Sequence, residues 1–429
     1  MKKPLSDFYN LLRVLTYLQV ISGLPLSSAI TKIYHNLSKK TDRCLVKKVP
    51  RREFCGIEVT PFKYGAAGAF CVSIDLELSW GKRFTKGSCF APVFSSISRR
   101  NFQYVLAALE KYSIPATWAI VGHLFLVNCE KDPVTKFAHP EMPRPSFHKN
   151  RHWEYTKGDW YQHDPCNSLH NAPEWYAADL VSKILCSSIR HEVGTHSFSH
   201  IDFSNCDKDL AYAELLKCKE IMRSYNLTPR SLVFPGNLEG QFEVLPKVGI
   251  IAFRGPNQDS KLQYPDRLEN GLWAIPGSMQ LTGRGIEKKL VSKAIRLIDS
   301  AIENNAVFHL WFHVHEVDKR MVEKALLPIF DYAKRARNRG VLWIATMEEI
   351  ANYCEAAANV TGNVVIYDNE LRIELKSIEH INRSRFINPE VSLKVGKRFL
   401  NVMINGKPIE AFELHSKDDS FVVTLPLKD

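Results

Sequence analysis

The chain has 429 residues, of which 45% are apolar and 24% are charged. These are ordinary globular proportions, so wholesale disorder and a fibrous repeat are excluded. Lys and Arg number 57 against 46 Asp and Glu, and the net charge of +11 favours anionic surroundings. Membrane headgroups, phosphorylated carriers, acidic glycans and nucleic acid all fit that charge, and so does a solvated basic surface. The length allows two or three domains.

Ten cysteines are scattered along the chain without a C-x-x-C pair. That spacing excludes a zinc ribbon. Several of the cysteines lie in apolar runs, such as Cys71 and Cys186. Buried free thiols in a reducing compartment are the simplest interpretation.

The first 60 residues are predicted to form an N-terminal helical extension. Residues 8–36 are amphipathic, and polar residues interrupt any secretion-signal pattern: Asp7, Arg13 and Gln19. Packing of this segment against the main domain is the favoured interpretation, and contact with a membrane surface is the alternative. No apolar run reaches about 18 residues, so no spanning helix is expected. The expected location is the cytoplasm, with membrane association left open.

Strand-like and helix-like segments then alternate. In chain order, strands are predicted at 69–78, 116–125, 191–198, 231–235, 250–255, 306–313 and 341–347. Helices are predicted at 101–114, 208–225, 244–249, 287–305, 318–338 and 348–358. Such repeats are typical of an α/β fold with a parallel sheet, here a barrel or near-barrel over residues 61–357. Catalytic groups are then expected at the carboxyl ends of the strands.

Two regions break this rhythm. Residues 126–180 are rich in proline, histidine and aromatic residues, and they are predicted to form a lid or a substrate-binding wall. Residues 360–429 alternate apolar and polar positions between turn signals, which predicts a small C-terminal antiparallel β domain. Asn405–Gly406 is a strong hairpin signal within it.

Titratable residues gather where the predicted strands end. His196 and His200 have an H-x3-H spacing that suits a metal site, although two ordinary loop histidines would look the same. Asp75 and Glu77 share one face of an otherwise apolar strand, so they require a partner, either a metal ion or a buried Lys or Arg. Two further strand ends carry titratable residues: one has His313 and His315, and the other has Arg254.

The order of these motifs resembles the polysaccharide deacetylase (NodB-homology) family of metal-dependent de-N-acetylases. The resemblance covers about residues 66–350. It rests on SIDLELSWG (73–81), GTHSFSH (194–200), SLVFPGN (231–237) and FHLWFHVH (308–315), with support from PATWAIVGHLF (115–125) and GDWYQHDP (158–165).

The resemblance implies a distorted (β/α) barrel, a zinc ion or another divalent transition metal, and hydrolysis of an N-acetyl group on a sugar. It implies Asp75 as general base, His313 as general acid and Arg254 as the residue that orients Asp75. The implied metal ligands are Glu77, His196 and His200. Substrate contacts are expected from Trp118, His123, Trp160, Tyr161, Pro235, Asn237 and His315. The sequence departs from the family pattern at Asp75-Leu76-Glu77, where adjacent aspartates are common, and at Gly236, where arginine is common.

Three functions follow from these features. The leading one is metal-dependent N-deacetylation of a glycan or of a nucleotide- or lipid-linked glycan precursor. Hydrolysis of linear or cyclic non-sugar amides is the second, and a catalytically degenerate carbohydrate-binding protein is the third. The expected partner is an N-acetylated glycan or sugar carrier rather than nucleic acid, with peripheral membrane contact left open.

Overall fold

The computed structural model describes residues 46–47, 52–54, 57–256, 259–367, 370–376, 385–386, 389–396, 401–404, 407–408, 415–417 and 420–426. Most of the predicted helical extension lies outside these residues. Where the structure does describe it, the prediction is wrong, because the segments are short strands: β1 (Val46–Lys47), β2 (Arg52–Phe54) and β3 (Ile57–Val59).

The main sheet is built on seven parallel strands in the order β15-β4-β5-β8-β9-β10-β13. Their bounds are β4 (Gly68–Leu76), β5 (Thr117–Ile120), β8 (Glu192–Thr195), β9 (Ser231–Val233), β10 (Ala252–Gly255), β13 (Trp273–Pro276) and β15 (Val307–His313). The sheet ends at β1 on one side and β12 on the other, so it curls without closing in the described part of the chain. This confirms the predicted α/β near-barrel.

Short strands complete the sheet edges. β16 (Leu342–Ile344) runs parallel to the start of β4, while β5 pairs with its end. The segment between β10 and the next helix, for which the sequence predicted no element, contributes β11 (Leu262–Gln263), β12 (Asp266–Arg267), β13 and β14 (Met279–Gln280). These strands have only two to four residues, too few to show a period in the sequence.

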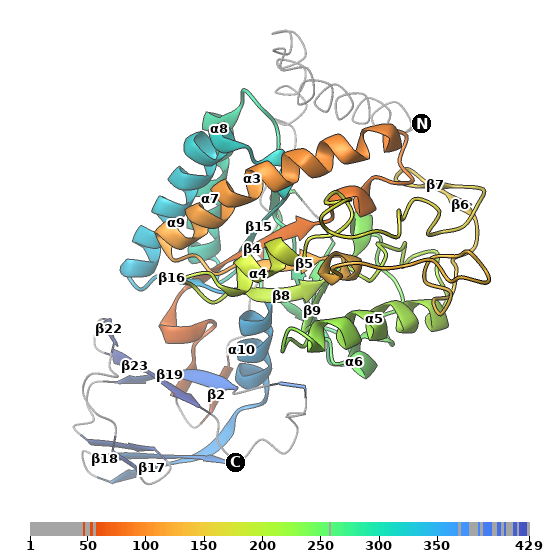
Figure 1. The fold of residues 1–429 in the computed structure, drawn as a ribbon. Helices are drawn as coiled ribbons and strands as arrows, with labels where there is room; N and C mark the ends of the chain where they lie inside the picture. Colours follow the sequence, from red (N-terminus) through yellow and green to blue (C-terminus); the bar gives the residue numbers. More distant parts are fainter. Residues whose placement is uncertain are drawn as a thin grey trace, which may run out of the picture.

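Helices cover the sheet, with α3, α7 and α9 grouped apart from α5 and α6 (Figure 1). Their bounds are α3 (Ala91–Tyr112), α4 (Ala178–Leu185), α5 (Lys208–Arg223), α6 (Leu245–Val248), α7 (Glu287–Glu303), α8 (Lys319–Met321), α9 (Leu327–Asn338) and α10 (Met347–Asn359), with a π turn at Val322–Leu326. Single 3-10 turns lie at Lys63–Gly65, Leu78–Gly81, Ser88–Phe90, Gly122–Phe125, Pro235–Asn237 and Val314–Glu316. None of the helices in the described residues is both long and apolar enough to cross a membrane.

Helix α3 begins ten residues before the predicted start. Pro92 lies in its first turn, where the missing N–H costs nothing, and Phe94 and Ile97 are buried against the barrel. Strand β4 is buried at all nine positions, as expected for a central parallel strand covered on both faces. Its carboxyl end therefore lies at the centre of the sheet, next to the ends of β15 and β5.

Residues 126–180 form a long insert with one two-stranded sheet, β6 (His148–Lys149) and β7 (Glu154–Tyr155), and the start of α4. Buried aromatic residues attach the insert to the barrel: Trp153, Tyr155, Trp160, Tyr161, Trp175 and Tyr176. The insert is therefore an integral wall of the domain.

Strands from the C-terminal part of the chain form two flanking sheets (Figure 1). Their bounds are β17 (Thr361–Tyr367), β18 (Glu370–Lys376), β19 (Glu390–Gly396), β20 (Asn401–Ile404), β21 (Lys407–Pro408), β22 (His415–Lys417) and β23 (Ser420–Pro426). The sheet β2-β3-β19-β23-β22 is antiparallel throughout, whereas β18 and β20 of the second sheet are parallel. Antiparallel pairing of Ile404 with Lys407 confirms the predicted hairpin.

The predicted boundary of this β region needs a correction, because β2 and β3, which precede the barrel, belong to its antiparallel sheet. The hydroxyl of Tyr353 in α10 donates to the carbonyl of Thr60 at 2.8 Å, next to this sheet. Thr60 in turn donates its N–H to the carbonyl of Ser392 at 2.9 Å. The sheet is therefore bound directly to the last helix of the barrel.

Candidate active site

Polar side chains from four strands of the main sheet meet at its carboxyl edge. Asp75 is the penultimate residue of β4, and His313, the last residue of β15, is its partner in register. Arg254 lies in β10, and His196 directly follows β8. The structure thus brings together the residues that the sequence singled out, at the edge where a parallel sheet is expected to place them.

Glu77, His196 and His200 form a compact buried group. Oε1 of Glu77 lies 3.1 Å from Nε2 of His196 and 3.3 Å from Nε2 of His200. Although burial raises the pKa of Glu77, the imidazoles of His313 and His200 lower it, and the net pKa lies well below its ordinary value. Burial lowers the pKa of His200 to about 4. Glu77 is therefore a carboxylate, and His200 is a neutral imidazole.

The hydrogen bonds of this group fit a bound cation. Nδ1 of His196 lies 2.6 Å from the carbonyl oxygen of Val233, an acceptor, so Nδ1 carries the proton and Nε2 presents a lone pair. That lone pair faces the Glu77 carboxylate, and two acceptors at such a distance require a cation or a proton between them. Two histidines and one carboxylate are a known ligand set of catalytic zinc, with open positions left over.

The loop after β8 positions both histidines. Ser197 and His200 adopt left-handed backbone conformations with φ of 58° and 57°, which turn the chain back on itself. Glu214 of α5 accepts hydrogen bonds from Ser199, at 2.7 Å from its N–H and 2.6 Å from its hydroxyl. These bonds hold the turn, so that His196 and His200 point to one place.

Asp75 is paired with Arg254 through two parallel hydrogen bonds of 2.8 Å each. Both side chains are almost fully buried. The guanidinium lies 4.2 Å from the ring centre of Trp311, and it also donates to Oδ1 of Asn237 at 3.2 Å. Two hydrogen bonds from one planar guanidinium fix the orientation of the carboxylate, and the positive charge of the guanidinium balances the negative charge of the carboxylate.

His313 lies between two carboxylates. Its Nδ1 is 2.9 Å from Oε2 of Glu316, and its Nε2 is 3.3 Å from Oε1 of Glu77. Burial lowers the pKa of His313, but the negative charges of Glu77 and Glu316 raise it by more. The net pKa therefore lies well above its ordinary value. Glu316 was not singled out from the sequence. Its place three residues after His313, in an HVHE run, was the available signal.

The structure explains the unusual glycine of the third motif. Gly236 has φ of 61°, and a Cβ at this position would meet the Trp153 ring at 2.9 Å. Trp153 belongs to the insert, where Asn150 accepts its N–H at 2.9 Å. The Trp153 ring also lies 5.4 Å from that of His200. The insert thus fills the space in which a larger residue at position 236 would lie, while Arg254 pairs with Asp75.

Most of the predicted substrate contacts are not at the site surface. Trp118, His123, Trp160 and Tyr161 are at most 1% exposed, so their rings are not available to stack on a sugar in this structure. Each has a different environment: Trp118 packs on Phe102 and His191, Trp160 donates to Ser199, Tyr161 donates to Glu214, and His123 joins a separate polar cluster in the insert. Aromatic composition alone does not show which way a ring points.

The other three predicted contacts lie close to the site. Asn237 accepts from Arg254, as described, and the adjacent Pro235 is buried. The His315 ring lies behind His313, 5.2 Å from it and 5.3 Å from Phe94. Asn237 and His315 therefore contact residues of the candidate site, at Arg254 and His313 respectively.

The chain was compared with known protein families, curated proteins and solved structures. A family model described as polysaccharide deacetylase matches residues 83–239. No curated protein matches the chain. Over residues 83–239 the chain is therefore similar to the polysaccharide deacetylase family.

Similar solved structures include a putative polysaccharide deacetylase from Mycobacterium smegmatis, at 13% identity over 71% of this chain and 94% of that one, with a TM-score of 0.46. A probable polysaccharide deacetylase from Pseudomonas aeruginosa PAO1 has 12% identity over 67% and 90%, with a TM-score of 0.44. Puue allantoinase has 12% identity over 68% and 92%, with a TM-score of 0.45.

Proposed function

We propose that the protein is a metal-dependent hydrolase that removes N-acetyl groups from a sugar in a glycan or glycan precursor. The observation that carries the proposal is the convergence of three units on one point: the Glu77 group with its two histidines, the Asp75–Arg254 pair and the His313–Glu316 pair. Two of these units are in direct contact, because Oε1 of Glu77 lies 3.3 Å from Nε2 of His313.

Glu77, His196 and His200 would hold the metal ion, for which zinc fits the donor set. When bound, a divalent ion at this site lowers the pKa of a water molecule and polarises the acyl oxygen. Glu77 is already ionised without it, because neighbouring imidazoles offset the cost of burial. The three side chains thus provide one negative charge and two neutral donors.

Asp75 acts as the general base, accepting the proton of the attacking water. Arg254 occupies one lone pair on each carboxylate oxygen, and the second lone pair of each oxygen remains for a substrate water. Because the guanidinium keeps Asp75 in one orientation, the base is ready before the substrate binds.

His313 acts as the general acid, donating a proton from Nε2 to the departing amine. Glu316 accepts the Nδ1 proton and stabilises the imidazolium form. An amide is hard to hydrolyse because its amine is a poor leaving group, so this proton delivery is essential. The raised pKa of His313 keeps the acid protonated near neutral pH.

Acetate release from N-acetylated chito-oligosaccharides of increasing length is the direct test, with small linear and cyclic amides assayed in parallel. Zinc-loaded wild type is expected to release acetate, whereas Asp75→Asn and His313→Ala are expected to be inactive. His170→Ala is the matched control, because His170 is an exposed histidine of the insert.

Each other outcome favours a different function. Turnover of small amides without acetate release assigns the chain to non-sugar amides. Stoichiometric zinc and glycan binding without turnover of any substrate indicates a carbohydrate-binding protein. Either result would overturn the proposal.

A further inference from the structure

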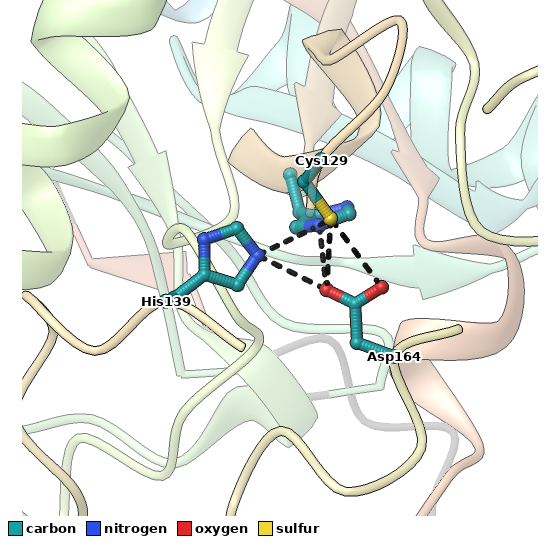
Figure 2. Close-up of side chains that lie close together, drawn as sticks. Cys129, His139 and Asp164 are labelled. Atoms are coloured by element: carbon teal, nitrogen blue, oxygen red, sulfur yellow. Dashed lines mark hydrogen bonds and ion pairs between the residues drawn. The ribbon is translucent and has the colours of Figure 1, made fainter. Parts of the chain in front are cut away.

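A second group of metal-ligand atoms lies inside the insert, separate from the candidate active site. It consists of His123, Cys129, His139 and Asp164, whose ligand atoms all lie within 4.8 Å of one another. His123 follows β5 on the barrel, and the other three residues belong to the insert. Figure 2 shows Cys129, His139 and Asp164 pointing toward one another. We propose that these four residues form a structural zinc site that attaches the insert to the barrel.

The distances in this group match the edges of a tetrahedron around zinc. With Zn–N and Zn–S bonds of about 2.0 and 2.3 Å, two nitrogens lie about 3.3 Å apart, and nitrogen and sulfur about 3.5 Å. Here the Nε2 atoms of His123 and His139 are 3.1 Å apart, and Cys129 Sγ is 3.7 Å from Nε2 of His123. Oδ2 of Asp164 lies 3.5 Å from the sulfur and 3.0 Å from Nε2 of His139.

The hydrogen bonds around the group turn its lone pairs inward. Nδ1 of His123 lies 3.3 Å from the carbonyl oxygen of Trp175, so its Nε2 faces the group as an acceptor. That Nε2 is 2.9 Å from Oδ2 of Asp164, another acceptor. One proton can bridge a single pair of these atoms, whereas a cation at the centre serves all of them.

The group is shielded from solvent. His123 and Asp164 are fully or almost fully buried, and His139 is 8% exposed. Oδ2 of Asp164 lies within 3.0 Å of Nε2 of both histidines. Buried polar atoms need partners, and a bound cation would serve all of these ligand atoms at once.

Neighbouring groups orient the four ligands, as is usual for metal sites. The Cys166 N–H donates to Oδ1 of Asp164 at 2.9 Å, and the Tyr176 hydroxyl lies 3.1 Å from Cys129 Sγ. His139 adopts a left-handed conformation with φ of 49°, and Arg144 donates to its carbonyl at 2.6 Å. This backbone conformation is unfavourable for histidine, yet it turns the ring toward the other three ligands. It is therefore consistent with a metal site.

The composition of the site indicates its role. Four protein ligands leave no open position for water, which is typical of structural rather than catalytic zinc. A thiolate with two imidazoles favours zinc over magnesium or calcium. The insert has little secondary structure of its own, so a metal that joins its distant residues 129, 139 and 164 to the barrel would replace the missing hydrogen-bonded framework.

Cobalt substitution tests this site apart from the active site. Metal-depleted, reduced full-length protein is reloaded with Co²⁺, and near-ultraviolet absorption from thiolate-to-cobalt charge transfer is recorded. The candidate active site has no sulfur ligand, so this absorption reports on the insert alone. It is expected in wild type and in the His196→Ala/His200→Ala double variant, and expected to be lost in Cys129→Ser.

Two controls sharpen the result. Cys206→Ser should keep the absorption, because Cys206 is also partly buried but donates to the Phe203 carbonyl elsewhere in the domain. Asp164→Asn should lower metal content by about one equivalent per chain, measured by mass spectrometry.

The double variant leaves all four proposed zinc ligands in place, so it decides the question even where Cys129→Ser fails to fold. No charge-transfer absorption in wild type or the double variant would overturn the proposal. Absorption that survives Cys129→Ser but is lost in Cys166→Ser would do the same. Neither measurement depends on acetate release, so the proposed activity and the zinc site can fail separately.

Discussion

His313 and Asp75 are paired in register across two parallel strands, and Nε2 of His313 lies 3.8 Å from Oδ2 of Asp75. Their relative position is therefore determined by the backbone hydrogen bonds between β15 and β4. A slip of one residue would turn one of the two side chains to the other face of the sheet. The proposed acid and base thus keep their spacing without help from a loop.

Removal of the Glu316 carboxylate should impair proton donation by His313. In Glu316→Ala, Nδ1 loses its acceptor at 2.9 Å, so ring orientation and imidazolium stability both suffer. We expect kcat to fall by about 10–100-fold with little change in KM. Steady-state kinetics on the acetylated substrate measure kcat and KM separately. Glu323→Ala, at an exposed residue of the same region, should behave as wild type, and a change confined to KM would contradict the assigned role.

Replacement of Arg254 should cost stability as well as activity. Arg254→Met leaves the buried Asp75 carboxylate without its partner, which we expect to lower the free energy of unfolding by about 3–5 kcal/mol. The double variant Arg254→Met/Asp75→Asn removes the unpaired charge and should recover part of that loss. Urea unfolding of both variants measures the difference. Equal stability of the single and double variants would show that the ion pair does not hold Asp75 in its charged form.

Gly81 makes room for the proposed metal ligand Glu77. A Cβ at position 81 would meet Oε2 of Glu77 at 1.9 Å, so Gly81→Ala must displace the carboxylate. We expect metal affinity at this site to fall by about 10–100-fold with the fold retained. Gly87→Ala is the matched control, since a Cβ there meets nothing within 4 Å. Competition with a chelator measures affinity, and equal values for the two variants would argue against Glu77 as a ligand.

The pair Glu192 and Glu348 should make stability depend on pH. Burial and the charge of Glu192 raise the pKa of Glu348 to about 7, and burial also raises that of Glu192. A raised carboxyl pKa means that the folded state binds a proton which the unfolded state has lost. This contribution to stability is therefore fully present below the unfolded pKa of about 4.3, and it is lost as pH rises from there to about 7.

Glu348→Gln should flatten this dependence. Urea midpoints at about pH 5 and about pH 8 should differ less in the variant than in wild type, with the larger gain at the higher pH. Other carboxylates respond to pH in both proteins, so the comparison of slopes isolates Glu348. Parallel slopes would show that Glu348 does not titrate in this range.

The sequence was sufficient to predict several residues that meet at the candidate site, because strand ends are local features. Asp75 and His313 each end an apolar run, and parallel pairing then brings such ends together. The same reasoning found Arg254, at a third strand end. In contrast, Glu77 lies one residue beyond β4, in a helical backbone conformation, and still reaches the site.

The rest of the site could not be predicted because it depends on irregular backbone. In the insert, no period links residue number to side-chain direction, so Trp160 and Tyr161 resembled a sugar platform although they are buried. For the same reason the sequence did not predict the group of His123, Cys129, His139 and Asp164. Its members come from four places in the chain with no fixed spacing. The pairing of β3 with β19 is equally non-local.

That pairing has a consequence for biosynthesis. Val59 of β3 is synthesised before the barrel, but its partner Leu393 in β19 follows after it. At about 5–20 residues per second, the ribosome needs on the order of tens of seconds to reach β19. Throughout that time the nascent barrel exposes an unpaired strand edge beside the apolar Phe62, a surface prone to aggregation. The C-terminal strands thus cover this edge only once the whole barrel has been made.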